Sequence, residues 1–403
     1  MAKAPKDIDI LQEFRFSRLI LPILIGVAVL IYAVYKVRQE DINLLTDIPW
    51  KPEMLVWLVI GFIFMGARDL GYTWRMRILT DKKLSWRNAL EITLLWEFAS
   101  AMTPSVVGGS ALAIFMLVKE KISAGKSTAI VFITIFLDEL FYIIILPVLL
   151  LLVSYSSIFD PISGHASTIG TGLAVAFWIA YGVLIAYTAF LAFALFIRPT
   201  ATAGAIKRMF RWRIFRRWKD SAAELADDLV TASREYRGKS LSFWLWSWTA
   251  TFLAWIGRYL VLNAVLAMFT GLTIWQHLEA FARQVVMFQV MLVSPTPGGS
   301  GFAEGAFRPL MQEFSPEGMV LILAVLWRII TYYPYLLVGI PLLPRWLRRV
   351  YGKKKAPKVG MDEVVTEDPH SGDSSPSNGK GDSAPTSNGK EEPVIVKKND
   401  EGR

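Results

Sequence analysis

Long apolar runs separated by short polar segments make up most of this 403-residue chain. Six of these runs are long enough, with some tilt, to cross a hydrocarbon core of about 30 Å. They cover residues 17–37, 52–67, 128–153, 172–197, 241–269 and 319–343. The core of a soluble domain does not need runs of this length, so the pattern predicts an all-α polytopic membrane protein with about six full transmembrane helices, in a domain spanning 17–349.

Two further apolar stretches, 89–118 and 279–313, are interrupted by proline and glycine. Proline prevents a continuous helix and glycine permits turns, so the first stretch is broken at 103–110 and the second at 294–301. Broken backbone at membrane depth persists only where protein or a water-filled cavity receives its unpaired groups. We expect two oppositely oriented re-entrant helical hairpins, although two short helices that cross fully would give the same net topology.

The chain is similar to itself at an offset of 190 residues. The matching positions are Arg68 and Arg258, Gly108–Ser110 and Gly298–Ser300, Asp138 and Arg328, and Tyr142 and Tyr332. The two spans that carry Arg68 and Arg258 are separated by an odd number of crossings, so the halves, about 52–197 and 241–343, form an inverted repeat. Short hydrophobic segments broken at matching places in two halves are typical of a transport site near the bilayer midplane.

Basic residues are distributed unevenly between the loops. Segment 198–240 carries eleven Lys or Arg against five Asp or Glu, whereas loops 154–171 and 270–280 carry no Lys or Arg. By the positive-inside rule, 198–240 is a cytoplasmic loop and both termini, including residues 1–16, are cytoplasmic. The net charge of +9 is therefore explained by membrane topology and does not indicate nucleic-acid binding.

The ends of the chain and its long basic loop have distinct compositions. Run 17–37 is too long for a signal core and no small-residue cleavage site follows it, so we expect an uncleaved anchor.

Residues 350–403 are rich in Ser, Gly, Pro, Asp and Lys, which predicts a disordered cytoplasmic tail. Segment 206–218 combines an apolar stripe with arginines, which favours either an interfacial helix on anionic headgroups or a loop that only fixes topology.

The two breaks supply most of the candidate substrate-binding residues. These are Pro104, Gly108, Gly109, Ser110, Pro295, Pro297, Gly298, Gly299, Ser300 and Gly301. The helix after the second break would point its amino end at the cavity, which suits an anion such as phosphate. Glu304 follows the second break by one helical turn, at or near membrane depth, where a role in gating, proton coupling or cation pairing is expected. The alternative is that Glu304 is only a carboxylate near the amino end of a helix, stabilised by the helix dipole. Glu97 precedes the first break and is a candidate headgroup contact or a carboxylate solvated at the membrane rim.

Charged residues inside apolar spans complete the candidate site. Asp138 and Arg328 are equivalent in the repeat, and charged groups in such helices face the protein interior, so we expect them to pair or to share a ligand. A purely structural ion pair is the alternative. Tyr332 joins the site through its repeat match. Arg68 and Arg258 are expected near span ends, where they would either extend to the headgroup region or each hold a lipid phosphate at its own leaflet.

Catalytic chemistry has little support in the sequence. The three histidines have no metal-ligand spacing and no nucleophile beside them, and the chain has no cysteine. We therefore predict no catalytic residues, no metal site and no cofactor.

These motifs resemble the flippase-like membrane region of lysylphosphatidylglycerol synthases and its stand-alone relatives. The most specific match is a Pro-x-Pro-Gly-Gly-x-Gly-x-x-Glu signature at 295–304, and Arg328 followed by Tyr332, Tyr333 and Pro334 resembles the family's late arginine-containing helix. The resemblance covers most of residues 10–345 and implies movement of a lipid between leaflets. It does not imply aminoacylation, because no soluble synthetase domain is present. Many members carry Gly-Glu and a following Arg in the first hairpin, which this chain lacks.

The expected function is translocation of a phosphate-bearing lipid or lipid-linked precursor across a bacterial inner membrane. The first alternative is a secondary transporter of a small polar solute, with Glu304 or Asp138 carrying protons. A membrane enzyme acting on lipid-linked substrates and a non-transporting anchor subunit are further alternatives. The expected partners are membrane lipids, in particular anionic ones, and not nucleic acid; a homo-oligomer stays open.

Overall fold

The computed structural model describes residues 51–102, 106–163, 169–212, 219–292, 302–316 and 318–351, together with Ile31 and Tyr35. All regular elements in these ranges are helical. The α-helices are α4 (Pro52–Leu79), α5 (Trp86–Met102), α6 (Val106–Lys119), α7 (Ala124–Leu152), α8 (Tyr155–Ser163), α9 (Ile169–Ala192), α10 (Pro199–Met209), α11 (Lys219–Tyr236), α12 (Leu241–Ala267), α13 (Ile274–Leu292), α14 (Phe302–Met311), α15 (Val320–Thr331) and α16 (Tyr333–Tyr351). A π-helical turn, η1 (Phe193–Ile197), follows α9, and a 3-10 turn, η4 (Gln312–Phe314), follows α14.

Within the part of the chain that the structure describes, five helical segments are long and apolar enough to cross a membrane. They are Pro52–Leu79, Ala124–Leu152, Phe177–Ile197, Leu241–Ala267 and Val320–Tyr351. α4 exposes Leu55, Val59, Phe62 and Ile63, whose spacing places them on one helical face suited to lipid contact. The predicted all-α polytopic class is confirmed, and the chain is a multi-pass integral membrane protein. The predicted span at 17–37 lies outside the described residues, apart from Ile31 and Tyr35.

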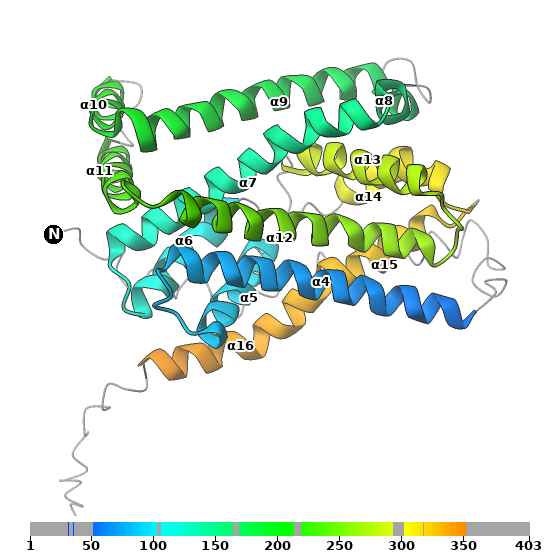
Figure 1. Cartoon of the computed structure of the whole chain (residues 1–403), viewed down its shortest axis with the longest axis horizontal. Coiled ribbons are helices and arrows are strands. Elements are labelled where there is room, and N and C mark those ends of the chain that lie inside the picture. Colours follow the sequence, from blue (N-terminus) through cyan, green and yellow to red (C-terminus); the bar gives the residue numbers. More distant parts are fainter. Residues whose placement is uncertain are drawn as a thin grey trace, which may run out of the picture. The chain divides into compact units, whose positions relative to one another are not determined.

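Helices α4 and α12 pack along one another in opposite directions (Figure 1). Gly61 of α4 faces Ala264, whereas Gly71, further along α4, faces Ala254, so residue numbers rise along one helix and fall along the other. A Cβ at Gly71 or Gly257 would lie 2.9 Å from a backbone oxygen of the partner helix. Glycine at these two positions therefore allows the two backbones to approach closely, as small residues do in membrane helix pairs.

The two halves of the chain repeat the same order of helix neighbours. In the first half α4 packs on α5, α5 on α6 and α6 on α7. In the second half α12 packs on α13, α13 on α14 and α14 on α15. Together with the antiparallel α4 and α12, this order agrees with the inverted repeat expected from the offset in the sequence, which stays a prediction.

Helices α5 and α6 form the first predicted hairpin, and α13 and α14 form the second. At about 1.5 Å per residue, the 14-residue α6 is about 21 Å long and the 10-residue α14 about 15 Å. Both are shorter than a hydrocarbon core of about 30 Å. Of the predicted breaks at 103–110 and 294–301, residues 106–110 belong to α6, which is a correction to the first break. Residues 103–105 and 294–301 lie outside the described residues, so re-entry into the membrane stays a prediction.

The last span is broken at Tyr332, between α15 and α16. Pro334 has no backbone N–H and disfavours helical geometry in the residue before it, which explains a helix boundary here. The Tyr332 hydroxyl donates a hydrogen bond of 3.0 Å to the carbonyl oxygen of Ala101, next to the end of α5. The break in the second half is thereby tied to the end of α5, next to the tip of the first hairpin.

Two helix boundaries differ from the sequence prediction. α4 does not end near residue 67 but continues to Leu79, because Arg68 and Arg75 are buried against neighbouring helices instead of marking a solvated end. The predicted interfacial helix at 206–218 is also wrong as a continuous helix. α10 ends at Met209 and Phe210 begins a turn, while 213–218 lie outside the described residues.

Candidate functional site

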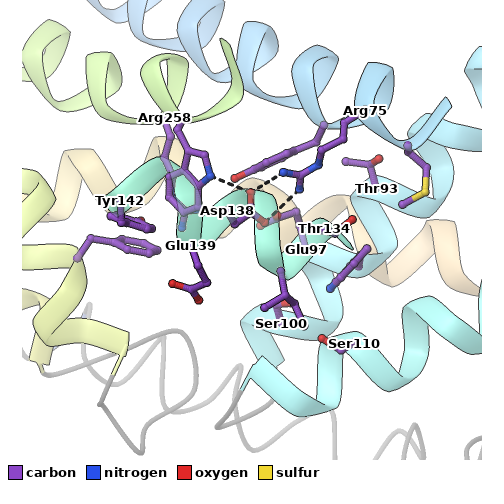
Figure 2. Close-up of a pocket in the computed structure, with 16 residues that line it drawn as sticks. Arg75, Thr93, Glu97, Ser100, Ser110, Thr134, Asp138, Glu139, Tyr142 and Arg258 are labelled. Atoms are coloured by element: carbon purple, nitrogen blue, oxygen red, sulfur yellow. Dashed lines mark hydrogen bonds and ion pairs between the residues drawn. The ribbon is translucent and has the colours of Figure 1, made fainter. Parts of the chain in front are cut away.

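Polar residues recur at helical spacing on four helices. The sets are Arg68, Tyr72 and Arg75 on α4; Thr93, Glu97 and Ser100 on α5; Thr134, Asp138 and Tyr142 on α7; and Thr251, Trp255 and Arg258 on α12. Within each set the residues are three or four positions apart, so they share one face of their helix. Members of all four sets line one cavity (Figure 2).

This cavity has a volume of about 240 Å³. Its walls also include Ser110 of α6 and Phe288 of α13. The complete lining is Tyr72, Arg75, Met76, Thr93, Trp96, Glu97, Ser100, Ser110, Thr134, Ile135, Asp138, Glu139, Tyr142, Trp255, Arg258 and Phe288. Aromatic rings alternate with a small number of charged and hydroxyl groups, which is typical of a pocket that orients a polar ligand group.

Asp138 is the centre of a hydrogen-bond cluster in the cavity wall. Its Oδ1 and Oδ2 accept hydrogen bonds of 2.5 and 3.1 Å from the two terminal nitrogens of Arg75. Trp255 Nε1 donates a third hydrogen bond, of 2.9 Å, to Oδ1 (Figure 2). Arg75 also donates to the Thr251 hydroxyl at 3.1 Å. A bidentate guanidinium and an indole thus satisfy a carboxylate that would be costly unpaired at membrane depth.

Glu97 is held from behind the cavity wall by Arg68. Their ion pair measures 2.6 Å, and the Arg68 side chain is 1% exposed. The same guanidinium forms an ion pair of 3.0 Å with Asp69 and donates a hydrogen bond to the Tyr335 hydroxyl, which in turn donates to Asp69 at 2.6 Å. Residues from α4, α5 and α16 therefore fix the orientation of Glu97.

Arg258 brings a positive charge into the cavity wall. Its guanidinium lies over the rings of Trp255 and Phe288, at 5.2 and 4.7 Å from their centroids. Among the described residues, no carboxylate lies within ion-pair distance of it. Aromatic faces stabilise a guanidinium while leaving its N–H donors available, so Arg258 can receive an anion.

Counting partners among the described residues alone, three buried polar atoms in the cavity wall lack a hydrogen bond. They are the hydroxyl oxygens of Thr93 and Thr134 and Oε2 of Glu139. Thr93 and Thr134 both line the cavity and are 4% and 5% exposed. In Figure 2 the Glu139 carboxylate points away from the Asp138 cluster. Buried polar groups are almost always satisfied, so these atoms indicate that the cavity receives polar ligand atoms or water.

No group of three or more His, Asp and Glu residues is arranged to hold a metal ion in the ranges that the structure describes. Of the cavity carboxylates, Glu97 and Asp138 form ion pairs with arginines, whereas Glu139 forms none with a described residue. The arrangement therefore supports binding and orientation of a polar group, and it presents neither a nucleophile with an adjacent base nor a metal-ligand set.

The comparisons with known proteins cover the whole cavity. The family described as the lysylphosphatidylglycerol synthase TM region matches residues 19–339, which include every lining residue. The chain belongs to this family. A curated UPF0104 membrane protein from Archaeoglobus fulgidus is 26% identical over 290 residues, covering 70% of this chain and 84% of that protein. No solved structure matches the chain.

Several predicted site residues of this family member meet at the cavity. Ser110, Asp138, Glu97 and Arg258 line it, and Gly109 is buried against Ser100. Gly108 lies in α6, where its backbone alone is described. Likewise, only the backbone of Glu304 is described, in α14. The remaining break residues lie outside the described residues: Pro104, Pro295, Pro297, Gly298, Gly299, Ser300 and Gly301.

The predicted ion pair between Asp138 and Arg328 is wrong. Asp138 binds Arg75 and Trp255, while Arg328 lies on α15 against the rings of Trp327 and Tyr332. α7 packs mainly on α6, α9, α11, α12 and α13, whereas α15 packs on α4, α12, α14 and α16. Repeat-equivalent residues meet only close to the pseudo-two-fold axis, and these two lie away from it.

The predicted position of Arg68 and Arg258 near span ends is also wrong. Both lie in the interior of their helices, and Gly257 packs directly on the backbone of Arg68, so the two arginines are close to the crossing of α4 and α12. Arg68 is buried and paired, which excludes extension to headgroups at the membrane surface.

Sequence reasoning missed Arg75, Thr93, Thr134 and Trp255 as cavity residues. Arg75 lies beyond the predicted span at 52–67, because a charge after an apolar run usually marks the end of a span. The signal that could have found these residues is their helical spacing to Arg68, Glu97, Asp138 and Arg258.

Proposed function

We propose that this membrane protein moves a phosphate-bearing lipid, or a lipid-linked precursor, between the leaflets of a bacterial inner membrane. The observation that carries the proposal is Arg258, a guanidinium in the wall of a cavity among membrane-spanning helices, with no described carboxylate to neutralise it. A guanidinium matches the geometry of a phosphate and is weakly hydrated, so it suits an anionic headgroup that leaves water.

The other features of the cavity agree with a headgroup ligand. The unpaired hydroxyls of Thr93 and Thr134 can bind ester or glycerol oxygens, and a volume of about 240 Å³ is on the scale of a headgroup but not of two acyl chains. The acyl chains would stay in lipid, along apolar faces such as that of α4. Movement of one repeat half against the other would expose the headgroup site to each side in turn.

The proposal includes cytoplasmic termini, in agreement with the basic loop at 198–240. Its partners are anionic membrane lipids, which the basic residues of α10, Lys207 and Arg208, would also contact at the membrane surface. Self-association is compatible with this proposal but not required by it, because the cavity is built from one chain.

Reconstitution tests the proposal directly. In liposomes that contain tail-labelled phosphatidylglycerol, the protein should accelerate loss of fluorescence when a membrane-impermeant quencher is added outside. Arg258→Gln should slow this by about tenfold or more, which corresponds to about 1.4 kcal/mol of lost headgroup binding. Arg234→Gln, an exposed arginine on α11, is the matched control and should behave as the unsubstituted protein. Equal rates in protein-free and protein-containing vesicles would exclude lipid movement.

A secondary transporter of a small polar solute is the second candidate. It is favoured by the two buried, unpaired threonine hydroxyls, since a solute with several hydroxyl groups would satisfy both. Uptake of a radiolabelled solute without any redistribution of labelled lipid would support this candidate over the first.

A further inference from the structure

Charges around the cavity do not balance. Among the described residues, seven arginine, aspartate and glutamate side chains on α4, α5, α7 and α12 lie in the cavity wall or directly behind it. Three are guanidiniums (Arg68, Arg75 and Arg258) and four are carboxylates (Asp69, Glu97, Asp138 and Glu139). With all seven ionised, this set has one more negative than positive charge. An uncompensated charge at membrane depth is unfavourable, and one bound proton removes it.

The pairing pattern identifies the carboxylate that takes this proton. Asp69 and Glu97 share Arg68, at 3.0 and 2.6 Å, and Asp138 is bidentate to Arg75. Glu139 has no guanidinium partner, and its buried Oε2 has no hydrogen-bond partner in the described part of the chain. Adding a proton to any other carboxylate would break an ion pair, whereas adding it to Glu139 breaks none.

The groups around Glu139 come from each of the neighbouring helices. Asp138, beside it on α7, is a negative charge that acts on it. α4 presents Arg75, which is committed to Asp138, and α12 presents Arg258 over Trp255 and Phe288. Glu97 of α5, which pairs with Arg68, also lies in the cavity wall. The uncharged neighbours are Ser110 of α6, Phe288 of α13 and the phenol of Tyr187 on α9.

We propose that Glu139 is a proton-binding site that couples lipid movement to the proton gradient, an inference that rests on the proposed function. A proton from cavity water adds to a carboxylate oxygen of Glu139 and neutralises it. The cavity then accepts an anionic headgroup at Arg258 without accumulating negative charge. By linkage, proton and anion favour each other's binding to the same extent, so they cross together. Lipid therefore accumulates in the leaflet that faces the alkaline side.

The experiment imposes a pH gradient on proteoliposomes with the membrane potential clamped by potassium and an ionophore. Tail-labelled phosphatidylglycerol is the probe, and its distribution between leaflets is read with an impermeant quencher. The unsubstituted protein should enrich the probe at least twofold in the leaflet facing the alkaline side, and a protonophore should abolish the enrichment. Glu139→Gln should show no gradient response, whereas Glu53→Gln, an exposed glutamate in the first turn of α4, should respond as the unsubstituted protein.

The outcomes separate this inference from the proposed function. Probe movement without any gradient response in the unsubstituted protein overturns proton coupling but keeps lipid movement. No probe movement under any condition overturns the proposed function. A gradient response retained by Glu139→Gln overturns the site. A second measurement is used if the Glu139→Gln protein moves no lipid. Infrared spectroscopy at neutral pH should show a protonated carboxyl band in the unsubstituted protein that Glu139→Gln lacks. The same band in both proteins overturns the assignment.

Discussion

At the scale of single residues, the cavity wall depends on how each membrane-embedded charge is satisfied. Asp138 accepts three hydrogen bonds, two from Arg75 and one from Trp255, and these join α7 to α4 and α12. Breaking a buried pair leaves the other charge without a partner, which is much more destabilising than the net strength of the pair suggests. Arg75 and Asp138 should therefore behave as one energetic unit.

A double-mutant cycle tests this unit. Arg75→Gln and Asp138→Asn should each lower the free energy of unfolding by about 3–5 kcal/mol, because each leaves a buried charge unpaired. The double variant should fall short of the sum by about 1–3 kcal/mol. Unfolding in mixed micelles with increasing denaturing detergent gives the measurement.

The matched control cycle combines Asp138→Asn with Arg328→Gln. Arg328 does not pair with Asp138, so these two effects should add within about 0.5 kcal/mol. Additive effects of Arg75 and Asp138, together with coupled effects of Asp138 and Arg328, would contradict the observed pairing and restore the pair predicted from the repeat.

At the scale of helices, the existence of most elements was predictable and their partners were not. Apolar runs indicated the spans, and the repeat indicated two antiparallel halves, because both depend only on periodic sequence features. The end of α4 was missed because Arg68 and Arg75 look like a solvated terminus unless their buried partners are known. Those partners come from α5, α7 and α16, and contacts between segments distant in sequence are not encoded in local patterns.

The crossing of α4 and α12 yields an element-scale prediction. A Cβ at Gly71 would lie 2.9 Å from both the Ala250 oxygen and the Ala254 nitrogen, which are backbone atoms that cannot rotate away. Gly71→Ala should therefore force the helices apart and destabilise the protein by about 1–3 kcal/mol, seen as a lower melting temperature in detergent.

Gly66 provides the control on the same helix. A Cβ there meets nothing within 4 Å, so Gly66→Ala should be neutral or slightly stabilising, since alanine favours helix over glycine. Equal loss of stability in both variants would show that glycine acts here through helix flexibility and not through close packing.

At the scale of the whole molecule, the two repeat halves are also joined where α4 ends and α12 begins. Asp81 follows α4 in a left-handed turn, with a φ of 53°. Its carboxylate pairs with Lys126 of α7 and, at 2.6 Å, with Lys239 just before α12. Burial acts to raise the pKa of Asp81, but hydrogen bonds and charge from these lysines outweigh it and lower the pKa below its usual range. One carboxylate thus links both halves.

The lowered pKa of Asp81 gives this link a pH dependence of definite sign. A carboxyl with a lower pKa in the folded than in the unfolded state stabilises the fold at pH values above the unfolded pKa, and this contribution is lost as pH falls through the folded pKa. At pH 7, Asp81→Asn should therefore melt at a lower temperature than the unsubstituted protein, and the difference should shrink below about pH 4. Asp220→Asn removes an exposed carboxylate from α11 and should leave the melting temperature unchanged at every pH. A difference for Asp81→Asn that persists unchanged into acid would mean that the aspartate acts through its turn geometry alone and that its charge does not join the two halves.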